Sequence, residues 1–357
     1  MSSSITTTAI APEWQNVYRK AMSAIVSGGN SNTKALNLIY GDSPRAYAKD
    51  LYEFERKYEA NGSVPMVLRG GQYIDINGAK KTMAQFNPLL WKVKSSYSAV
   101  DLQKMSQYIG ETARENFRAD AVSTHLMRIK KTLNNNAIVS IRGGVVANEY
   151  VTAQGVAYTD QNYGLIWSDS VGAGAFSARM QDGVTITNVD WGNASTTIAD
   201  IETSISDILR SAEDKGINPA DLILLVGKET FNAVVAKVTA FLSTTKAAGR
   251  YDYIVDRIGG TVTLGTVVLK RVIDSCTINS VSYSLVDDKY ITAIVKPQYN
   301  DWVYMAPEDI NFLYTPVEYH TKEVADIYGE NFEVLTQSRQ FLCPDTNGVF
   351  TVKVIAG

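Results

Sequence analysis

Two short stretches contain residue types that could do chemistry. His320-Thr-Lys-Glu323, with Asp326 three residues further on, offers an imidazole and two carboxylates, which are typical ligands of a divalent metal. On a helix these ligands would share one face, but the Tyr, Thr and Val residues around them favour a strand or a loop. Gly172-Ala-Gly174 is glycine-rich but lacks the third glycine of a dinucleotide-binding fingerprint. A metal or phosphate site is therefore the less favoured interpretation of both stretches.

The other reactive residues have ordinary structural explanations. We expect His125, the other of the two histidines, on the solvated side of a long helix. Cys276 and Cys343 have no partner spacing, so inert and partly buried thiols are expected. Asp287 and Asp288 are typical of a solvated turn. The sequence has neither a Walker A loop nor a Gly-x-Ser-x-Gly motif. We therefore expect no catalytic residue, no cofactor and no metal.

The composition is that of a globular protein. Of the 357 residues, 45% are hydrophobic and 20% are charged, and the formal net charge is −3. A chain of this length can bury a sizeable core. The slightly acidic balance argues against a general nucleic-acid binder, which needs a basic face. The N-terminus lacks the pattern of a signal peptide and no apolar run approaches the ~20 residues of a membrane helix, so we expect a protein made in the reducing cytosol, with no membrane partner.

The clearest architecture is a helix–strand–helix module between residues 196 and 242. Thr197 and Asp200 form a variant of the capping box, and Lys215-Gly216 ends the first helix. The continuous apolar run Leu222–Val226 predicts a strand covered on both faces, and Gly227 opens the second helix. The expected buried positions are Ile198, Ile201, Ile205, Ile208, Leu209 and Ala212 in the first helix, and Phe231, Val234, Val235, Val238, Phe241 and Leu242 in the second.

Residues 1–61 predict an arm with two helices. The second helix would begin at Ser43, with Pro44 at its first position. These helices either pack on their own domain or lie on a neighbouring subunit. The stripes expected to make the contact are Trp14, Val17, Tyr18, Ala21 and Ile25 in the first helix, and Tyr47, Leu51, Phe54 and Tyr58 in the second.

Residues 62–98 contain a strong hairpin signal. Tyr73–Ile76 and Ala79–Met83 flank an Asn-Gly pair, which supplies both positive-φ positions of a type I′ turn. The hairpin either projects from the body onto a neighbouring subunit or folds onto a sheet as an ordinary edge hairpin. The tip residues that would contact a neighbour are Asn77, Gly78, Lys80 and Lys81.

Residues 99–133 predict the longest helix, with Lys130-Lys131 near its C-terminal end. Beyond it the chain changes mostly to short strands, of which Ile138–Ile141 is the first. We expect two further strand pairs, which are 283–286 with 290–295, closing at Asp287-Asp288, and 334–343 with 350–355.

The order of these elements and two stretches of sequence resemble the major capsid proteins of tailed bacteriophages. Residues 196–235, TTIADIETSISDILRSAEDKGINPADLILLVGKETFNAVV, are similar to the helix, Gly-x-x-Pro and strand–helix passage of lambda-type capsid subunits. Residues 322–356, KEVADIYGENFEVLTQSRQFLCPDTNGVFTVKVIA, resemble the closing strands of those subunits. Twenty tyrosines and five tryptophans would suit the contact surfaces of a shell.

The resemblance implies the α+β Hong Kong 97-type fold. It implies self-assembly of pentamers and hexamers into an icosahedral shell around phage double-stranded DNA, which the wall touches without sequence specificity. Scaffold, portal and decoration proteins would be further partners, and the virion capsid, assembled in the host cytoplasm, would be the location. The implied parts are an N-arm (1–61), an E-loop (62–98), a spine helix with a P domain (99–195), an A domain (196–319) and C-terminal strands returning to the body (320–357).

Three alternatives stay open at the level of the sequence. The same fold builds encapsulin-type nanocompartments, whose subunits would have a similar order of elements. A cytosolic α/β enzyme would use Gly172–Gly174 or His320–Glu323 as its site. A tail or baseplate protein of a phage is the third alternative.

Overall fold

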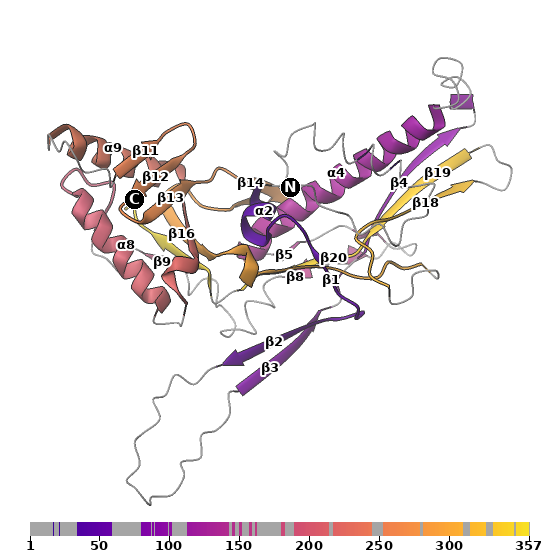
Figure 1. The fold of residues 1–357 in the computed structure, drawn as a ribbon, viewed down its shortest axis with the longest axis horizontal. Helices are drawn as coiled ribbons and strands as arrows, with labels where there is room; N and C mark the ends of the chain where they lie inside the picture. The colour runs from indigo at the N-terminus through magenta and orange to yellow at the C-terminus, as the bar shows by residue number, and fades with distance from the viewer. Residues whose placement is uncertain are drawn as a thin grey trace, which may run out of the picture.

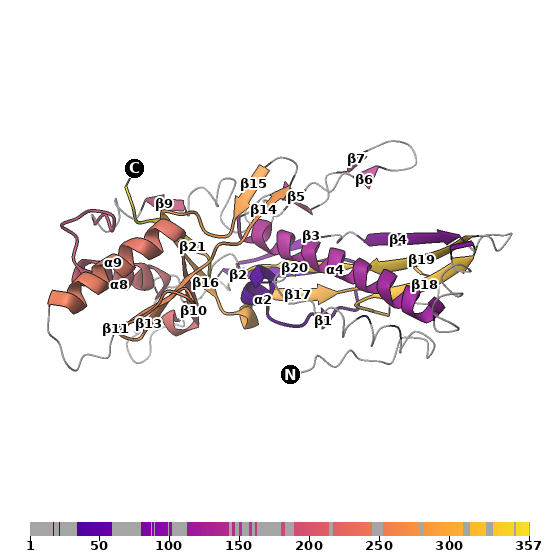
Figure 2. The same cartoon turned by 90° about the horizontal axis from the view of Figure 1, so that it is seen from above.

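The structure is a computed structural model with an α+β fold (Figures 1 and 2). A large sheet covered by two helices forms one end, and a long helix beside a smaller sheet forms the other. A two-stranded ladder projects from the middle of the body (Figure 1). The residues described are 17, 21, 34–58, 80–86, 88, 90–98, 100–101, 113–142, 145–146, 150–151, 157–158, 161–162, 180–182, 189–213, 217–244, 253–278, 281–309, 315–325, 331–345 and 348–356.

The described residues form helices, one large sheet, two smaller sheets and several strand pairs. The helices are α2 (Lys34–Tyr40), α4 (Ala113–Arg142), α8 (Ile198–Glu213), α9 (Lys228–Thr244) and the 3₁₀ turns η3 (Pro219–Asp221) and η4 (Pro297–Tyr299). In spatial order the largest sheet has β11 (Tyr253–Asp256), β12 (Thr261–Leu264), β13 (Val267–Arg271), β10 (Leu222–Val226), β16 (Tyr290–Val295), β21 (Phe350–Lys353) and β9 (Met180–Asp182). The three-stranded sheets are β18 (His320–Ala325), β19 (Asn331–Ser338) and β4 (Trp91–Ser98), and β1 (Arg45–Ala46), β17 (Asp301–Tyr304) and β20 (Gln340–Cys343). The two-stranded pairs are β2 (Tyr52–Tyr58) with β3 (Lys80–Phe86), β14 (Ser275–Ile278) with β15 (Val281–Ser284), β5 (Val145–Val146) with β8 (Gln161–Asn162), and β6 (Tyr150–Val151) with β7 (Ala157–Tyr158).

The predicted module α8–β10–α9 is confirmed. Thr197 and Asp200 cap α8 reciprocally, because each backbone N–H donates to the other's side chain, at 2.8 and 3.3 Å. The hydrogen bonds from Thr197 lower the pKa of Asp200 below its ordinary value. Leu242, which was expected on the buried face, is instead 40% exposed. The expected positions that are buried are Ile198, Ile201, Ile205, Ile208, Ala212, Phe231, Val234, Val235 and Val238.

Strand β10 joins the two hydrophobic cores of the molecule. Leu224 and Val226 pack in the core beneath α8 and α9, whereas Leu225 belongs to the core around α4. The prediction of a strand covered on both faces is therefore confirmed. The strand pairs parallel with β13 and antiparallel with β16. The predicted hairpin of 283–286 with 290–295 is wrong, because β16 is nearly all buried and takes a central place between β10 and β21.

The long helix α4 ends at Arg142, nine residues beyond the predicted end. Ile138–Ile141, predicted as a strand, is its last turn. Asparagine is a weak helix former, which made the run Asn134–Asn136 look like a stop. Tertiary contacts outweigh this preference, because Asn134 is buried and its Oδ1 accepts a hydrogen bond from the backbone N–H of Leu36 at 3.0 Å. Burial of each fully buried leucine or isoleucine of this helix adds about 1.5–3 kcal/mol to the stability of the fold, relative to an exposed side chain.

The predicted second helix of the arm is wrong. Its region holds β1 and β2, and the only helix of the described segment 34–58 is α2. The sequence Tyr52–Tyr58 alternates aromatic or long residues with charged ones, and this period of two is typical of a strand. Val17 and Ala21, from the first predicted helix, are buried in the core around α2 and α4. Trp14, Tyr18 and Ile25 lie outside the described residues.

The partner found for residues 80–86 is β2, in antiparallel register from Tyr52↔Phe86 to Tyr58↔Lys80. The sequence pattern predicts a different partner strand, residues 73–76, joined through a tight turn, and these residues lie outside the described part of the chain. Asn77 and Gly78 lie outside the described residues, while Lys80 and Lys81 form the start of β3.

The last 38 residues contribute strands to three sheets, so the predicted pair of 334–343 with 350–355 is wrong. β19 pairs with β4 and β18, and β20 pairs with β17. β21 pairs with β16 and β9, because Phe350 and Val352 complete the core beneath α8 and α9. The α/β unit therefore takes strands from both sides of the predicted segment 196–319.

We predict that Asn134→Ala lowers the free energy of unfolding by about 1–3 kcal/mol, because the buried N–H of Leu36 loses its acceptor. Asn135→Ala, at the next position, is the matched control and should be neutral or stabilising by at most ~0.7 kcal/mol, since alanine is the better helix former. Thermal or urea unfolding of both variants measures this. Equal losses in the two variants would contradict the role of Asn134.

Candidate functional site

The projecting β2–β3 ladder is anchored to the body at its base. Tyr52 is 2% exposed, its ring centroid lies 4.9 Å from that of Phe341, and its hydroxyl donates to Asp301. Burial raises the pKa of the Tyr52 hydroxyl, so it stays protonated and able to donate. Arg45 pairs with the other oxygen of Asp301 at 2.7 Å. The anchor therefore joins the first pair of the ladder to β17 and β20.

A second contact lies at the same base. Arg339 Nη2 donates to the carbonyl oxygen of Asp50 at 2.8 Å, and its Nε donates to the carbonyl oxygen of Pro88 at 2.9 Å. Asp50 precedes β2 and Pro88 follows β3. The guanidinium group therefore bonds to both chain segments that enter the ladder.

Each of the outer three strand pairs of the ladder contains a basic residue. The register places Lys57 directly opposite Lys81, and Arg56 and Lys80 occupy neighbouring pairs. Like charges opposite each other on a strand pair are destabilising. The outer three pairs contain no acidic residue to offset them.

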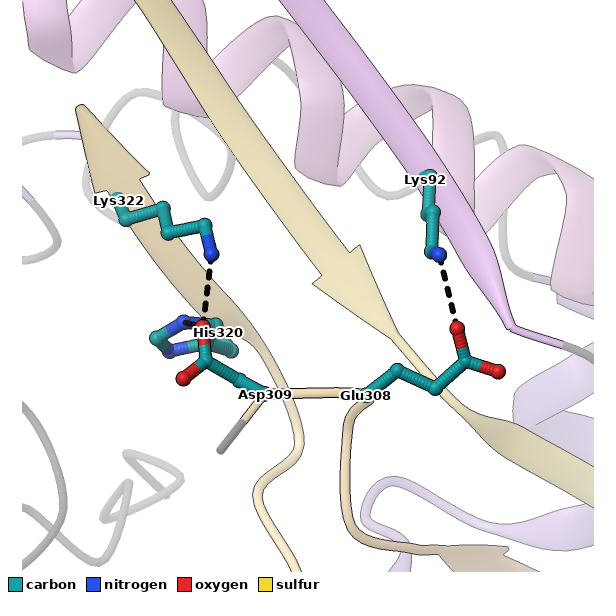
Figure 3. A network of polar contacts seen from close by, with 5 residues as sticks. All are labelled: Lys92, Glu308, Asp309, His320 and Lys322. Carbon is teal, nitrogen blue, oxygen red and sulfur yellow. Dashed lines mark hydrogen bonds and ion pairs between the residues drawn. The ribbon is translucent and has the colours of Figure 1, made fainter. Parts of the chain in front are cut away.

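A network of ion pairs covers the outer face of the sheet β18–β19–β4 (Figure 3). Asp309, whose side chain is 5% exposed, accepts from Lys322 Nζ at 2.8 Å and contacts His320 Nε2 at 3.2 Å. The adjacent Glu308 pairs with Lys92 of β4 at 2.8 Å. Burial lowers the pKa of His320, although the Asp309 carboxylate acts in the opposite direction. The network holds residues 308–309 across the sheet.

The geometry does not bring together the residues of the disfavoured metal-site interpretation. His320 lies on the strand β18, so Glu323 points to the opposite face, where it pairs with Arg118 of α4. Asp326 and Gly172–Gly174 lie outside the described residues. Within the part of the chain that the structure describes, no group of three or more His, Cys, Asp and Glu side chains could hold a metal. In the same residues, no helix is both long and apolar enough to cross a membrane.

His125 is 1% exposed, so the prediction of a solvated residue is wrong. Its Nε2 lies 2.8 Å from Ser95 Oγ of β4, and its Nδ1 lies 2.9 Å from Thr336 Oγ1 of β19. Burial, and secondarily the charge of Arg128, lowers the pKa of His125. The neutral imidazole therefore joins α4 to two strands of the sheet.

The remaining candidates also have structural roles. Cys276 and Cys343, expected to be partly buried, are buried, and burial raises the pKa of Cys276 to about 11. Asp287 pairs with Arg142 Nη2 at 2.7 Å, and the carbonyl oxygen of Asp288 accepts from the backbone N–H of Thr230 at 3.0 Å. This turn therefore ties the end of α4 to the start of α9.

The sequence located β3 as a hairpin strand but missed the base of the ladder. The sequence pattern places Tyr52 in a helix, which is wrong, and it does not indicate Arg339 or Asp301. Arg339 donates to backbone carbonyl groups, which every residue type has, so the sequence does not indicate these partners. The alternation of aromatic or long residues with charged residues within Tyr52–Tyr58 is the one local pattern that indicates a strand of the ladder.

Comparisons with known proteins place the chain among capsid proteins. A family model described as phage major capsid protein E matches residues 37–354. Among solved structures, the chain is similar to the capsid of cyanophage Pam1, with 12% identity, coverage of 90% of this chain and 91% of the other, and a TM-score of 0.47. It is also similar to the capsid of cyanophage A-1(L), with 13% identity, coverage of 91% and 93%, and a TM-score of 0.45. A comparison with curated proteins gave no match. The family assignment rests on the sequence match over residues 37–354.

We predict a loss of stability in mild acid that depends on His125. Its pKa is lowered in the folded state, so the unfolded chain binds the proton first as pH falls. The contribution of neutral His125 is fully present above pH ~6.5 and is lost as pH falls below that value towards the folded pKa. Urea unfolding at pH 7.5 and pH 5.5 should show a smaller acid loss for His125→Gln than for the unsubstituted chain. His320 is present in both proteins, so its effect cancels, and equal losses would contradict the prediction.

Proposed function

We propose that the β2–β3 ladder is the arm that contacts a neighbouring subunit, because the chain belongs to the family of phage major capsid protein E and is a subunit of a phage head shell. The alternatives of a nanocompartment shell, an enzyme or a tail protein are not favoured by this family. Each shell subunit makes modest contacts of defined geometry with its neighbours. A closed symmetric assembly repeats these contacts many times, and together they give a stable container.

The observation that supports this function is the position of the ladder. It leaves the body at Tyr52 and Phe86 and extends away from both cores (Figure 1). A two-stranded hairpin alone in water is at best marginally stable. A partner surface would supply packing for the described part of the ladder that projects from the body.

The basic pairs at the far end indicate the charge of that partner surface. Lys57 and Lys81 lie directly opposite one another, which costs stability unless an acidic group lies nearby. The chain as a whole has a net charge of −3, so a second copy can offer an acidic face. We therefore assign the ladder's contact to acidic side chains of a neighbouring subunit.

The other parts fit the same proposal. The ladder with residues 59–79 would be the E-loop, and the E-loop would thus begin at Tyr52 rather than at residue 62. Helix α4 would be the spine helix, the sheet β18–β19–β4 would belong to the P domain, and α8, α9 and their sheet would form the A domain. Trp14 and Tyr18 would lie in the N-arm. Val17 is buried within its own chain and would not contact a neighbour.

The proposed assembly consists of pentamers and hexamers in an icosahedral shell made in the host cytoplasm. The enclosed double-stranded DNA would meet a wall of near-neutral charge, which favours weak and non-specific contact. Scaffold, portal and decoration proteins would be the remaining partners.

We predict that Lys80→Glu combined with Lys81→Glu impairs assembly without lowering the thermal midpoint. The exchange replaces a like-charge cross-strand pair by an opposite-charge pair, which should stabilise the ladder by about 0.2–1 kcal/mol. The same exchange would repel an acidic neighbour. Particle yield, measured by sedimentation and negative-stain microscopy, should fall most at low ionic strength, since 0.1 M salt screens exposed charges beyond ~10 Å.

The matched control is Lys131→Glu combined with Lys228→Glu, which makes the same change in charge at two exposed positions of the body. This control should assemble with the yield of the unsubstituted chain. Unchanged yield of the Lys80 and Lys81 variant at every salt concentration would overturn the proposed contact.

A further inference from the structure

We propose that Arg339 is a positioning residue that sets the direction in which the β2–β3 ladder leaves the body. Its consequence for assembly rests on the function proposed above for the ladder. Its effect on the direction of the ladder can be tested on the single subunit.

Arg339 lies where two sheets meet. Ser338 is the last residue of β19, in the sheet with β4 and β18, and Gln340 is the first residue of β20, in the sheet with β17. The backbone of Arg339 is itself fixed, because its carbonyl oxygen accepts from the N–H of Met305 at 2.9 Å. Its side chain is 13% exposed. The guanidinium group is therefore carried by a rigid part of the body.

Two bonds from one planar group define an orientation. Nε donates to Pro88 at 2.9 Å and Nη2 donates to Asp50 at 2.8 Å, both at backbone carbonyl oxygens. Asp50 lies two residues before the first ladder pair, and Pro88 lies two residues after it. The donors of a guanidinium have a fixed fork geometry, so the two chain segments are held at a fixed separation and angle.

The other anchor holds one strand. Tyr52 packs on Phe341 and donates to Asp301, which fixes the β2 side of the base. The backbone N–H of Glu53 donates to the Tyr47 hydroxyl at 3.1 Å, which adds a second contact on the same strand. With contacts to β2 alone, the ladder could turn about that side of the base while its own strand pairing stayed intact. The exposed carboxylate of Asp50, 3.7 Å from Arg339 Nη1, adds little, because exposed ion pairs are weak. The bonds to the two carbonyl groups hold both chain segments at the base, so they set the direction.

The test is a distance distribution between two spin labels in the unassembled full chain. One label is placed by Glu55→Cys in β2 and the other by Lys131→Cys on the exposed side of α4. The native Cys276 and Cys343 are 7% and 3% exposed, so the reagent reaches the introduced thiols first.

Arg339→Ala should give a roughly twofold wider distribution, because ladder and body stay folded while their relative orientation is released. Its thermal midpoint should fall moderately, since the carbonyl oxygens of Asp50 and Pro88 lose their donor. Arg339→Lys keeps the charge but not the fork, and it should give an intermediate width. The matched control is Lys49→Ala, which removes the exposed pair of Lys49 with Glu53 at the same base and should leave the width unchanged.

An unchanged width in Arg339→Ala would overturn the proposal. If that variant does not fold, Arg339→Lys decides in the same way, and a width equal to that of the unsubstituted chain overturns it. Particle yield is measured in parallel. A widened distribution with normal shells would uphold the role of Arg339 and contradict the function proposed for the ladder.

Discussion

The packing of helix α4 against its neighbours is the interaction on which the rest of the structure depends. Leu126, Leu133 and Ile138 are fully buried, and the helix contacts α2, β4, β19, β20 and the β14–β15 pair. At the C-terminal end of α4, Arg142 pairs with Asp287, and the adjacent Asp288 accepts a backbone hydrogen bond from Thr230 near the start of α9. One helix thus aligns the sheet at one end of the molecule with the α/β unit at the other (Figure 2). This alignment gives a subunit of fixed shape.

A fixed shape is what a shell subunit needs, because its contacts must recur in every copy. The polar groups of the body serve the same end. His125 joins α4 to two strands, and Asp309 holds its segment to β18 through His320 and Lys322 (Figure 3). These histidine and carboxylate groups, which in another setting could ligate a metal or move protons, are engaged in structural contacts. The ladder β2–β3 is the exception, since it extends beyond both cores and has basic pairs at its end.

Local patterns predicted the parts of the fold whose stability is local. The helices α8 and α9 each follow from an apolar helical period, and the strand β10 follows from a continuous apolar run. The capping pair Thr197 and Asp200 marks the start of α8. The end of α4 could not be predicted from the local sequence, because Asn134 is held in the helix by a hydrogen bond from Leu36, 98 residues away. The partners of β16 and β21 depend on which strands share a core, which no local period encodes. For the candidate site, the sequence indicated the lysines of β3, but the base at Arg339 uses backbone oxygens that residue types do not reveal.

The assembly proposed for this chain is a closed shell in which the ladder of one subunit lies on the next. Electron cryomicroscopy of particles assembled from the purified full chain tests it most directly. We expect closed particles in which the density of residues 52–58 and 80–86 crosses to an acidic surface of a neighbouring subunit. Closed particles in which this density folds back over its own subunit, or a protein that stays monomeric over a wide range of concentration and salt, would contradict it.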